Sequence, residues 1–345
     1  MTKNSKKLTS LDQIGEFGLI NLLSKNVRLK NASSIMGIGD DSAIIDNSDL
    51  QTLVSTDMLV EGIHFDLSFT PIKHLGYKSV VVNLSDIYSM NAEPKQILIN
   101  IAISSKFSVE AIDEFYEGVS IACDEYSVDL VGGDTTSSVS GLIISCSVVG
   151  YSKETSIVRR NGAKNNDIIC VSGDLGRSFL GLKILQREKV NFIRNPKMQP
   201  SLNEYKDIIE KQLRPRARKD VFDFFKDEKI TPNSMIDISD GLSSELLHLS
   251  LNSNLGFKIF EDKLPIDKSC NKISDELKMD VVSCALNGGE EYELLFSLNP
   301  SDYEKIKEKK FDISPIGFFT KKNEKILVLN DENEIDLNSD GWNHF

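Results

Sequence analysis

The sequence predicts a two-domain protein of the α/β (α+β) class. Its 345 residues, of which 40% are hydrophobic, are enough to form two separate cores. Segments with the two-residue period of strands alternate with segments of helical period along the whole chain. A polar stretch at residues 152–167 separates the two halves. We therefore expect an N-terminal domain at residues 1–151 and a C-terminal domain at residues 152–345.

Each element of the first half follows from its own apolar pattern. Residues 11–25 carry apolar side chains at close to helical spacing, with Ser10 as a possible N-cap. The next predicted elements are, in order, a strand end at 53–55, a helix at 73–90 stopped by Asn91 and Pro94, a strand at 96–103, a helix at 109–123, and strands at 128–131 and 142–149. Several of these strands are close enough along the chain to pair antiparallel.

The second half continues the alternation. A strand at 168–171 runs into the turn 172–176 and then into a helix that extends through Leu185. A strand at 235–238 leads into a helix that we expect to begin at Ser239 or Asp240 and to continue to about Leu251. The remaining predicted elements are strands at 292–298, 314–319 and 325–329 and a helix near 301–310.

The bulk composition limits the classes of partner. Asp and Glu outnumber Lys and Arg by 52 to 40, giving a net charge of -12, so neither nucleic acid nor an anionic membrane is expected to bind. The five cysteines form no CxxC pair and there are only four histidines, which favours buried thiols in a reducing compartment over a zinc site. The sequence contains no signal-peptide pattern and no apolar run long enough for a transmembrane helix. We expect a cytoplasmic protein.

Acidic residues stand beside Gly, Ser or Thr at the ends of apolar segments. These segments are GDDSA at 39–43, STD at 55–57, NLSD at 83–86, VGGD at 131–134 and IDISDG at 236–241. If the carboxylates met without a counter-ion, each close pair would repel by about 4 kcal/mol at an effective dielectric of about 20. Mg²⁺ would remove this repulsion, because it prefers carboxylate, hydroxyl and phosphate oxygens. The pattern therefore predicts phosphate chemistry assisted by metal ions.

Each acidic segment also has a plainer interpretation. Residues 39–41 could form a solvated turn, Asp57 could cap a loop, and the glycines before Asp134 could form a hairpin turn. In the segment 236–241, an ordinary N-cap at the helix start would explain one of the two acids, Asp237 and Asp240, but not both. Asp86 is harder to explain in this way, because it shares one face of a largely apolar helix with Asn83.

Three further segments leave two interpretations open. The turn Gly173-Asp174-Leu175-Gly176 could hold a phosphate or simply connect a strand to a helix. The basic residues Arg159, Arg160 and Lys164 could bind a nucleotide phosphate or belong to a solvated linker. The segment NGGEEYE at 287–293 places two glycines before clustered acids and is weakly informative alone. Walker A, GxGxxG, GxSxG and HExxH motifs are absent from the sequence.

Taken together, these segments resemble the thiamine-monophosphate kinases, of the superfamily typified by aminoimidazole ribonucleotide synthetase (the PurM-like fold). The resemblance covers essentially the whole chain and rests on the order and spacing of GIGDDSA, STDMLVEGIHF, KSVVVNLSDIYSMNAEP, LVGGDTT, RRNGAK, IDISDGL and NGGEEYELLF. It implies an N-terminal mixed sheet that binds ATP and metals and forms a barrel with a second subunit in a homodimer. It also implies a C-terminal α/β domain that completes the active-site cleft.

The resemblance implies an ATP-dependent, in-line transfer of a phosphoryl group to thiamine monophosphate, giving thiamine diphosphate. The residues implied to hold several Mg²⁺ ions are Asp41, Ser55, Thr56, Asp57, Asp86, Asp134, Asp237 and Asp240. Those implied to bind ATP are Tyr116, Gly133, Asp134, Arg160 and Ser239, and those implied to bind the substrate are His64, Glu290 and Trp342. No dedicated general base is expected, because the attacking phosphate oxygen is already an anion.

Several alternatives remain. A selenophosphate synthetase would need a reactive cysteine near the amino terminus, whereas the first one here is Cys123. A hydrogenase-maturation dehydratase would need a carboxy-terminal cysteine, and this sequence ends in Asn343-His344-Phe345. Aminoimidazole ribonucleotide synthetase itself is the nearest alternative activity. A metal-dependent phosphatase and a non-catalytic metal-binding protein are alternatives from other classes, and neither would require ATP.

Overall fold

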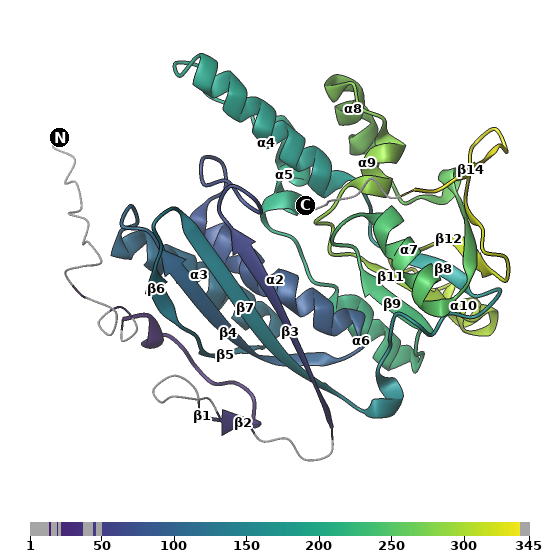
Figure 1. Cartoon of the computed structure of the whole chain (residues 1–345), viewed down its shortest axis with the longest axis horizontal. Helices are drawn as coiled ribbons and strands as arrows, with labels where there is room; N and C mark the ends of the chain where they lie inside the picture. Colours follow the sequence, from purple (N-terminus) through teal and green to yellow (C-terminus); the bar gives the residue numbers. More distant parts are fainter. Residues whose placement is uncertain (1–13, 15–18, 20–21, 37–43, 46–49, 339–345) are drawn as a thin grey trace. The chain divides into compact units, whose positions relative to one another are not determined.

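The computed structural model describes residues 14, 19, 22–36, 44–45 and 50–338 (Figure 1). The chain divides into two compact units, the first formed by Met1–Ile87 and Glu93–Lys153 and the second by Tyr88–Ala92 and Glu154–Phe345. Each unit combines a β-sheet with helices, which confirms the predicted α/β class. Of the helices described, none has the length and the apolar character needed to cross a membrane.

The sheet of the first unit is mixed, as predicted. Five strands of the described part have the order β3-β7-β4-β5, with β6 also beside β4. Strand β7 pairs antiparallel with both β3 and β4, whereas β5 and β6 run parallel to β4. The strands are β3 (Gln51–Val60), β4 (Glu93–Ile103), β5 (Asp129–Gly132), β6 (Thr135–Ser137) and β7 (Leu142–Ser152), and a separate ribbon pairs β1 (Ser34–Met36) with β2 (Ile44–Ile45).

Two long helices, α2 (Ile72–Ser89) and α3 (Val109–Tyr126), lie against one face of this sheet (Figure 1). Both lie close to their predicted ranges, and Ser108 caps α3 by accepting a hydrogen bond from the Ala111 N–H at 3.3 Å. The two helices approach closely at Gly76 and Gly118, because a Cβ at either glycine would overlap the backbone of the other helix.

The opposite face of the sheet is partly open. On β3, the side chains of Val54 and Met58 are 68% and 56% exposed. They alternate with residues that face the helices, as the two-residue period of a strand requires. Half-buried apolar residues of the neighbouring strands continue this row, among them Leu98 of β4 and Val149 of β7.

The sheet of the second unit has the order β14-β13-β10-β12-β8-β11-β9 within the part of the chain that is described. All neighbours pair antiparallel except β10 and β13, which are parallel. The strands are β8 (Ile168–Ser172), β9 (Ser234–Asp237), β10 (Gly256–Phe260), β11 (Leu294–Leu298), β12 (Ile313–Thr320), β13 (Lys325–Val328) and β14 (Glu334–Asp336).

Helices bury both faces of this sheet. Alternate residues of β8 and β11 belong to two different hydrophobic clusters, one built with α7 and α9 and the other with α6 and α10. Central strands buried on both faces read as continuous apolar runs, which explains why their positions are predictable. The helices are α4 (Arg177–Arg194), α5 (Lys206–Leu213), α6 (Lys219–Glu228), α7 (Leu242–Ser253), α8 (Lys268–Leu277), α9 (Val281–Asn287) and α10 (Pro300–Ile306).

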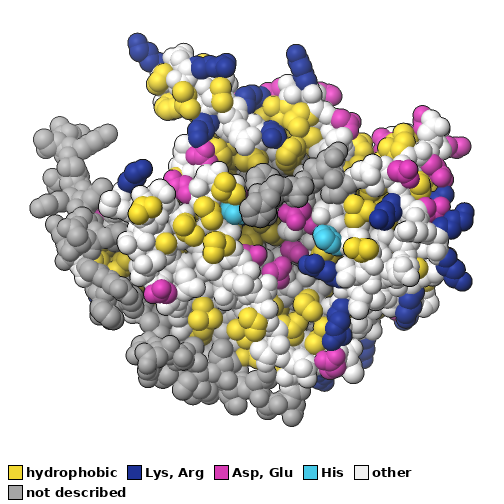
Figure 2. All heavy atoms as spheres, in the orientation of Figure 1, with side chains coloured by type: hydrophobic (Ala, Val, Ile, Leu, Met, Phe, Trp, Pro, Cys, Tyr) yellow, Lys and Arg dark blue, Asp and Glu magenta, His cyan; other side chains and the backbone are white. Residues whose placement is uncertain are grey.

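Several predicted bounds in the second unit were wrong. Helix α4 continues nine residues past the predicted end at Leu185, to Arg194, and helix α7 begins at Leu242 instead of Ser239 or Asp240. Strand β11 begins at Leu294, because the backbone at Tyr292 is left-handed with φ 53° and cannot join a strand. The extended end of α4 is exposed, and Figure 2 shows hydrophobic side chains mixed with Lys and Arg there. Ile193 in this turn is 65% exposed.

Candidate active site

Strand β3 and helix α2 bring three of the predicted metal ligands together. Ser55 and Asp57 alternate along β3 toward the helix, and Ser55 Oγ donates a hydrogen bond to Asp86 Oδ2 of α2. Asn83, one turn before Asp86, accepts a hydrogen bond from the Asp57 N–H at 3.1 Å. Its own amide donates to the Ser79 carbonyl at 3.0 Å, which fixes which atom faces the strand. The predicted shared face of Asn83 and Asp86 therefore points at β3.

Asp57 and Asp86 carry like charges at two half-buried positions. Burial, and to a smaller extent the negative charge of Asp86, raise the pKa of Asp57 from its usual 3.8 to about 6. Both causes destabilise the ionised carboxylate. A divalent cation would oppose both, since it attracts the two carboxylates and replaces part of the lost hydration. Two carboxylates and a hydroxyl also form the oxygen donor set that Mg²⁺ prefers, so these residues fit the predicted metal.

Thr56 lies on the other face of β3. Its Oγ1 donates a hydrogen bond to the Cys146 carbonyl at 2.7 Å and accepts one from Ser147 Oγ at 3.0 Å, both on β7. The structure therefore separates the Thr56 hydroxyl from the side chains of Ser55 and Asp57, as strand alternation requires. Its role as a metal ligand stays a prediction.

The glycine segment before Asp134 is not a hairpin turn, which removes that interpretation. Strands β5 and β6 both pair parallel with β4, so the chain passes Gly133 without reversing. A Cβ at Gly133 would overlap the Ile99 carbonyl, which gives this glycine a packing role beside its predicted contact with ATP. Asp134 is exposed, and its carbonyl accepts a hydrogen bond from the Ile101 N–H at 2.8 Å.

The surroundings of two ring side chains in the first unit determine where their protons lie. Nδ1 of His64 accepts a hydrogen bond from the Val60 N–H at 3.0 Å, so the proton of the neutral imidazole resides on Nε2. Tyr116 lies on α3, where burial raises the pKa of its phenol well above the usual range. The Tyr116 hydroxyl therefore stays a neutral hydrogen-bond donor and acceptor at physiological pH.

In the second unit, the segment after β9 carries Asp237, Ser239 and Asp240. Asp237 is buried at the end of the strand, and the Asp240 N–H donates a hydrogen bond to Glu245 Oε1 at 3.1 Å. Glu245 lies in the first turn of α7 and was missed by the sequence interpretation. Burial is the main cause that raises the pKa of Glu245 from 4.5 to about 8, and the charges of Asp240 and Asp237 add to it.

Glu290 lies directly beside this segment. Its N–H donates to the Ser239 carbonyl at 2.7 Å, and the Tyr292 N–H donates to the Ile238 carbonyl at 2.9 Å. Glu290 has a left-handed backbone with φ 62°, a conformation that costs a residue with a side chain about 1–2 kcal/mol. Its side chain accepts a hydrogen bond from Gln212 Nε2 at 2.5 Å. The predicted substrate residue Glu290 is thus close to Ser239, a predicted ATP residue.

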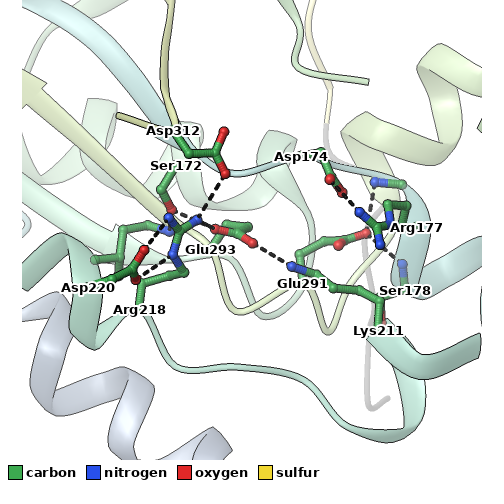
Figure 3. A network of polar contacts seen from close by, with 12 residues as sticks. Ser172, Asp174, Arg177, Ser178, Lys211, Arg218, Asp220, Glu291, Glu293 and Asp312 are labelled. Atoms are coloured by element: carbon green, nitrogen blue, oxygen red, sulfur yellow. Dashed lines mark hydrogen bonds and ion pairs between the residues drawn. The ribbon is translucent and has the colours of Figure 1, made fainter. Parts of the chain in front are cut away.

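Charged side chains of the second unit form a network around Glu291 and Glu293 (Figure 3). Glu293 is buried and accepts hydrogen bonds from Lys211, Arg218 and Ser172. Glu291 has no exposed surface, and its Oε1 accepts hydrogen bonds from the N–H groups of Gly176 and Ser178 at 2.8 and 3.1 Å.

The Glu291 carboxyl therefore occupies the start of helix α4. The turn at residues 173–176 thus connects a strand to a helix whose N–H groups are already satisfied by a protein side chain. This favours the connecting interpretation of that turn over the phosphate-binding one.

The remaining predicted residues are described only in part. Arg160 is exposed, and its carbonyl accepts a hydrogen bond from Ser253 Oγ at 3.2 Å. Asp41 and Trp342 lie outside the described residues. Within the described ranges, no three His, Cys, Asp or Glu side chains gather closely enough to hold a metal ion. The whole metal set, including Asp57 and Asp86, therefore stays a prediction.

The sequence and the fold are similar to those of known proteins. Residues 39–152 match the family described as AIR synthase related protein, N-terminal domain. The thiamine-monophosphate kinase of Buchnera aphidicola subsp. Schizaphis graminum is 36% identical over 339 residues, which cover 96% of this chain and 99% of that protein. The thiamine-monophosphate kinase of Bacillus subtilis is 32% identical over 339 residues, with the same shares of 96% and 99%.

Solved structures give the same result. A structure described as AaThiL complexed with AMPPCP and TMP has a TM-score of 0.74 and 30% identity, covering 99% of this chain and 100% of that one. The thiamine-monophosphate kinase from Stenotrophomonas maltophilia K279a has a TM-score of 0.75 and 27% identity, covering 91% and 95%. A hydrogenase maturation protein in complex with ATP has a TM-score of 0.73 at 16% identity, a likeness that shows the fold alone.

Proposed function

The chain belongs to the thiamine-monophosphate kinase family, with its PurM-like fold, and on this premise we propose how its residues catalyse the family reaction. The enzyme transfers the γ-phosphoryl group of ATP to thiamine monophosphate, giving thiamine diphosphate and ADP. The relatives match over nearly the full length of both chains, and one related structure is described with an ATP analogue and TMP. The single observation that carries the metal-assisted mechanism is the raised pKa of the half-buried carboxylate Asp57, which lies beside Asp86.

The pair Asp57 and Asp86, with the Ser55 hydroxyl, holds Mg²⁺ in this proposal. Bound Mg²⁺ ions would screen the charges of the two phosphates and orient the γ-phosphate for in-line attack. The other residues assigned to the metals are Asp41, Thr56, Asp134, Asp237 and Asp240. The protein supplies positioning and charge balance, and no side chain needs to remove a proton from the attacking phosphate oxygen.

The nucleotide and the substrate are assigned to separate sets of side chains. ATP contacts Tyr116, Gly133, Asp134, Arg160 and Ser239, and thiamine monophosphate contacts His64, Glu290 and Trp342. The hydrogen bond from Val60 to Nδ1 supports a donor role for His64, because it leaves the proton on Nε2. The carboxylate of Glu290 suits the positively charged thiazolium part of the substrate, and Trp342 could stack on the same ring.

We also propose that the enzyme is a homodimer in which the sheets of two first units meet. The exposed apolar side chains of Val54 and Met58 on β3 support this assignment. A row of apolar residues on an open sheet face is the kind of surface that a second sheet covers. Gel filtration of the unaltered protein at micromolar concentration tests it, and a monomer there would remove the proposal.

The activity is tested by incubating the pure protein with ATP, Mg²⁺ and thiamine monophosphate and separating the products by chromatography. Thiamine diphosphate and ADP are expected in equal amounts. Formation of inorganic phosphate without ATP would indicate the metal-dependent phosphatase instead. Consumption of formylglycinamidine ribonucleotide, with thiamine monophosphate left unchanged, would indicate aminoimidazole ribonucleotide synthetase.

A further inference from the structure

The turn between strand β9 and helix α7 carries two of the predicted site residues, Ser239 and Asp240, and its backbone is held at both. The segment that follows α9 holds the first, because the Glu290 N–H donates a hydrogen bond to the Ser239 carbonyl at 2.7 Å. A side chain holds the second, since the Asp240 N–H donates to Oε1 of Glu245 at 3.1 Å. Glu245 therefore contacts the turn at a residue that is assigned to a metal ion.

Glu245 differs from the ordinary helix caps of this chain. Asp267 precedes helix α8 and accepts the Ser269 N–H at 2.8 Å, within that helix. Asp280 precedes helix α9 and accepts the Ser283 N–H at 2.7 Å, again within the helix. Glu245 lies inside the first turn of α7 and accepts an N–H that comes before the helix. Its hydrogen bond therefore ties the preceding turn to the helix.

The glycine at the N-cap of α7 explains why the acceptor comes from further along the chain. Gly241 has φ 127°, a conformation that residues with a side chain rarely adopt, and a Cβ there would lie 3.0 Å from the backbone of Asn287. A capping side chain at position 241 would therefore be strained. Glu245 is four residues later, and its side chain can reach back over the N-cap because helix side chains tilt toward the N-terminus.

Burial makes a carboxyl group a poor source of stability at this place. Glu245 is only 2% exposed, and within the described part of the chain its Oε2 has no hydrogen-bond partner. Burying a polar atom in this way costs about as much free energy as one hydrogen bond to a backbone N–H returns. We therefore expect little net stability from Glu245. What its hydrogen bond does supply is a fixed position for the backbone of Asp240.

We propose that Glu245 is a positioning residue that holds the backbone of Asp240, and with it the Asp240 carboxylate, in place for a metal ion. This inference rests on the proposed function, in which Asp240 is a metal ligand and Ser239 contacts ATP. Mg²⁺ requires oxygen ligands at well-defined places, because it tolerates little departure from octahedral geometry. A group that holds such a ligand therefore affects metal binding without touching the ion.

The test compares three substitutions of Glu245. Glu245→Met removes the acceptor at similar length, Glu245→Asp keeps the carboxyl group but shortens its reach, and Glu245→Gln keeps the length and one acceptor oxygen. Calorimetric titration with Mg²⁺ in the presence of a non-hydrolysable ATP analogue measures binding without turnover. Glu245→Met and Glu245→Asp should weaken Mg²⁺ binding by about 10-fold, whereas Glu245→Gln should stay within about 2-fold of the unaltered protein. Glu210→Met, at an exposed glutamate of α5, is the matched control and should leave binding unchanged.

A double-mutant cycle with Asp240→Asn separates positioning from a general effect on the fold. If Glu245 acts through Asp240, Glu245→Met should weaken Mg²⁺ binding by less than about 2-fold in the Asp240→Asn background. Additive effects, unchanged binding in Glu245→Met, or an equal loss in Glu245→Gln would each overturn the proposal. Should Glu245→Met fail to fold, the comparison of Glu245→Asp with Glu245→Gln gives the same test, and equal binding in these two variants would overturn it.

The outcome can be told apart from a failure of the proposed function. If the unaltered enzyme makes thiamine diphosphate and Glu245→Met binds Mg²⁺ normally, only the role of Glu245 is wrong. If the unaltered enzyme makes no thiamine diphosphate, the proposed function itself fails. The Mg²⁺ titrations then still measure the inference, because binding need not lead to turnover.

Discussion

Acidic side chains gather in both units, but their charges are balanced in different ways. In the first unit, Asp57 lies near Asp86, and both burial and this neighbour raise its pKa to about 6. In the second unit, Glu293 lies between Arg218 and Lys211, which supply positive charges from the chain itself. The second cluster therefore has its cationic partners within the chain, whereas we propose that a cation from solution stabilises the first. We interpret the first cluster as a binding site and the second as a cluster that stabilises the fold.

The largest expected effect that tests this difference is on turnover. Asp86→Asn keeps the shape of the side chain but removes one of the two charges that attract Mg²⁺, so kcat should fall by about 10³-fold. The melting temperature of the metal-free protein should stay unchanged or rise, because the substitution also removes a repulsion near Asp57. Steady-state kinetics at high Mg²⁺ and calorimetry in chelator measure the two quantities.

A matched control for this variant is Asp113→Asn, an exposed carboxylate on α3. It should leave both turnover and melting temperature unchanged. Near-normal turnover in Asp86→Asn would contradict the binding-site interpretation. A clear loss of metal-free stability would show instead that the other contacts of Asp86 outweigh its repulsion of Asp57.

In the second unit, a substitution in the charged cluster is expected to lower the stability of the fold, whereas Asp86→Asn in the first unit is expected to lower turnover. Arg218→Met leaves Glu293 buried beside one cation instead of two, and breaking a buried pair of this kind costs about 3–5 kcal/mol of unfolding free energy. Urea denaturation measures the loss. Arg216→Met, at an exposed arginine of the same segment, should change the unfolding free energy by less than about 0.5 kcal/mol. A similarly small loss in Arg218→Met would mean that this cluster is not structural.

In the metal-free protein, the carboxyl groups of the two units should affect the unfolding free energy over different pH ranges. The pKa of Asp57 is raised on folding from 3.8 to about 6, so its stabilising contribution is complete below pH 3.8 and is lost as the pH rises through about 6. The pKa of Glu291 is likewise raised on folding, from 4.5 to about 8, so its stabilising contribution is complete below pH 4.5 and is lost as the pH rises through about 8. Calorimetry in chelator should find that Asp57→Asn reduces the change of stability with pH in the lower range, and that Glu291→Gln reduces it in the upper range. Unchanged slopes in both variants would show that neither pKa is shifted.

The sequence predicted the elements whose apolar pattern is continuous. Helix α2 and strand β8 are buried on nearly all sides, so their ranges follow closely from hydrophobicity. Strand β3 extends over Gln51–Val60, although only 53–55 was predicted, because half of its residues are polar and face solvent or Asp86. Strand β10 and helices α5 and α6 were missed, since short amphipathic elements give little periodic signal.

The site shows the same limit. Asp57 and Asp86 were predicted, because a carboxylate within an apolar segment is costly unless it has a partner. Gln212 was not, since it precedes Glu290 by 78 residues and lies on the unpredicted helix α5. Local patterns cannot show which distant side chain contacts a site residue. Glu245 is an intermediate case, because an acid in the first turn of a helix is a recognisable sequence signal.

The smallest expected effects come from one serine in each unit. The two substitutions should differ in which property they change, stability in one unit and Mg²⁺ dependence in the other. Ser172 is fully buried, donates to Glu293 at 2.7 Å and accepts from the Leu294 N–H at 2.8 Å. Ser172→Ala should lower the unfolding free energy by about 1–3 kcal/mol, because it leaves both partners without this bond, and should leave the Mg²⁺ dependence unchanged. Ser55→Ala removes the hydrogen bond to Asp86 at a half-buried site, so its stability loss should stay below about 1 kcal/mol. It should instead raise the Mg²⁺ concentration for half-maximal activity by about 10-fold, since Ser55 orients a proposed ligand. If both serines altered stability alone, the first cluster would be structural as well, and the division between the two units would disappear.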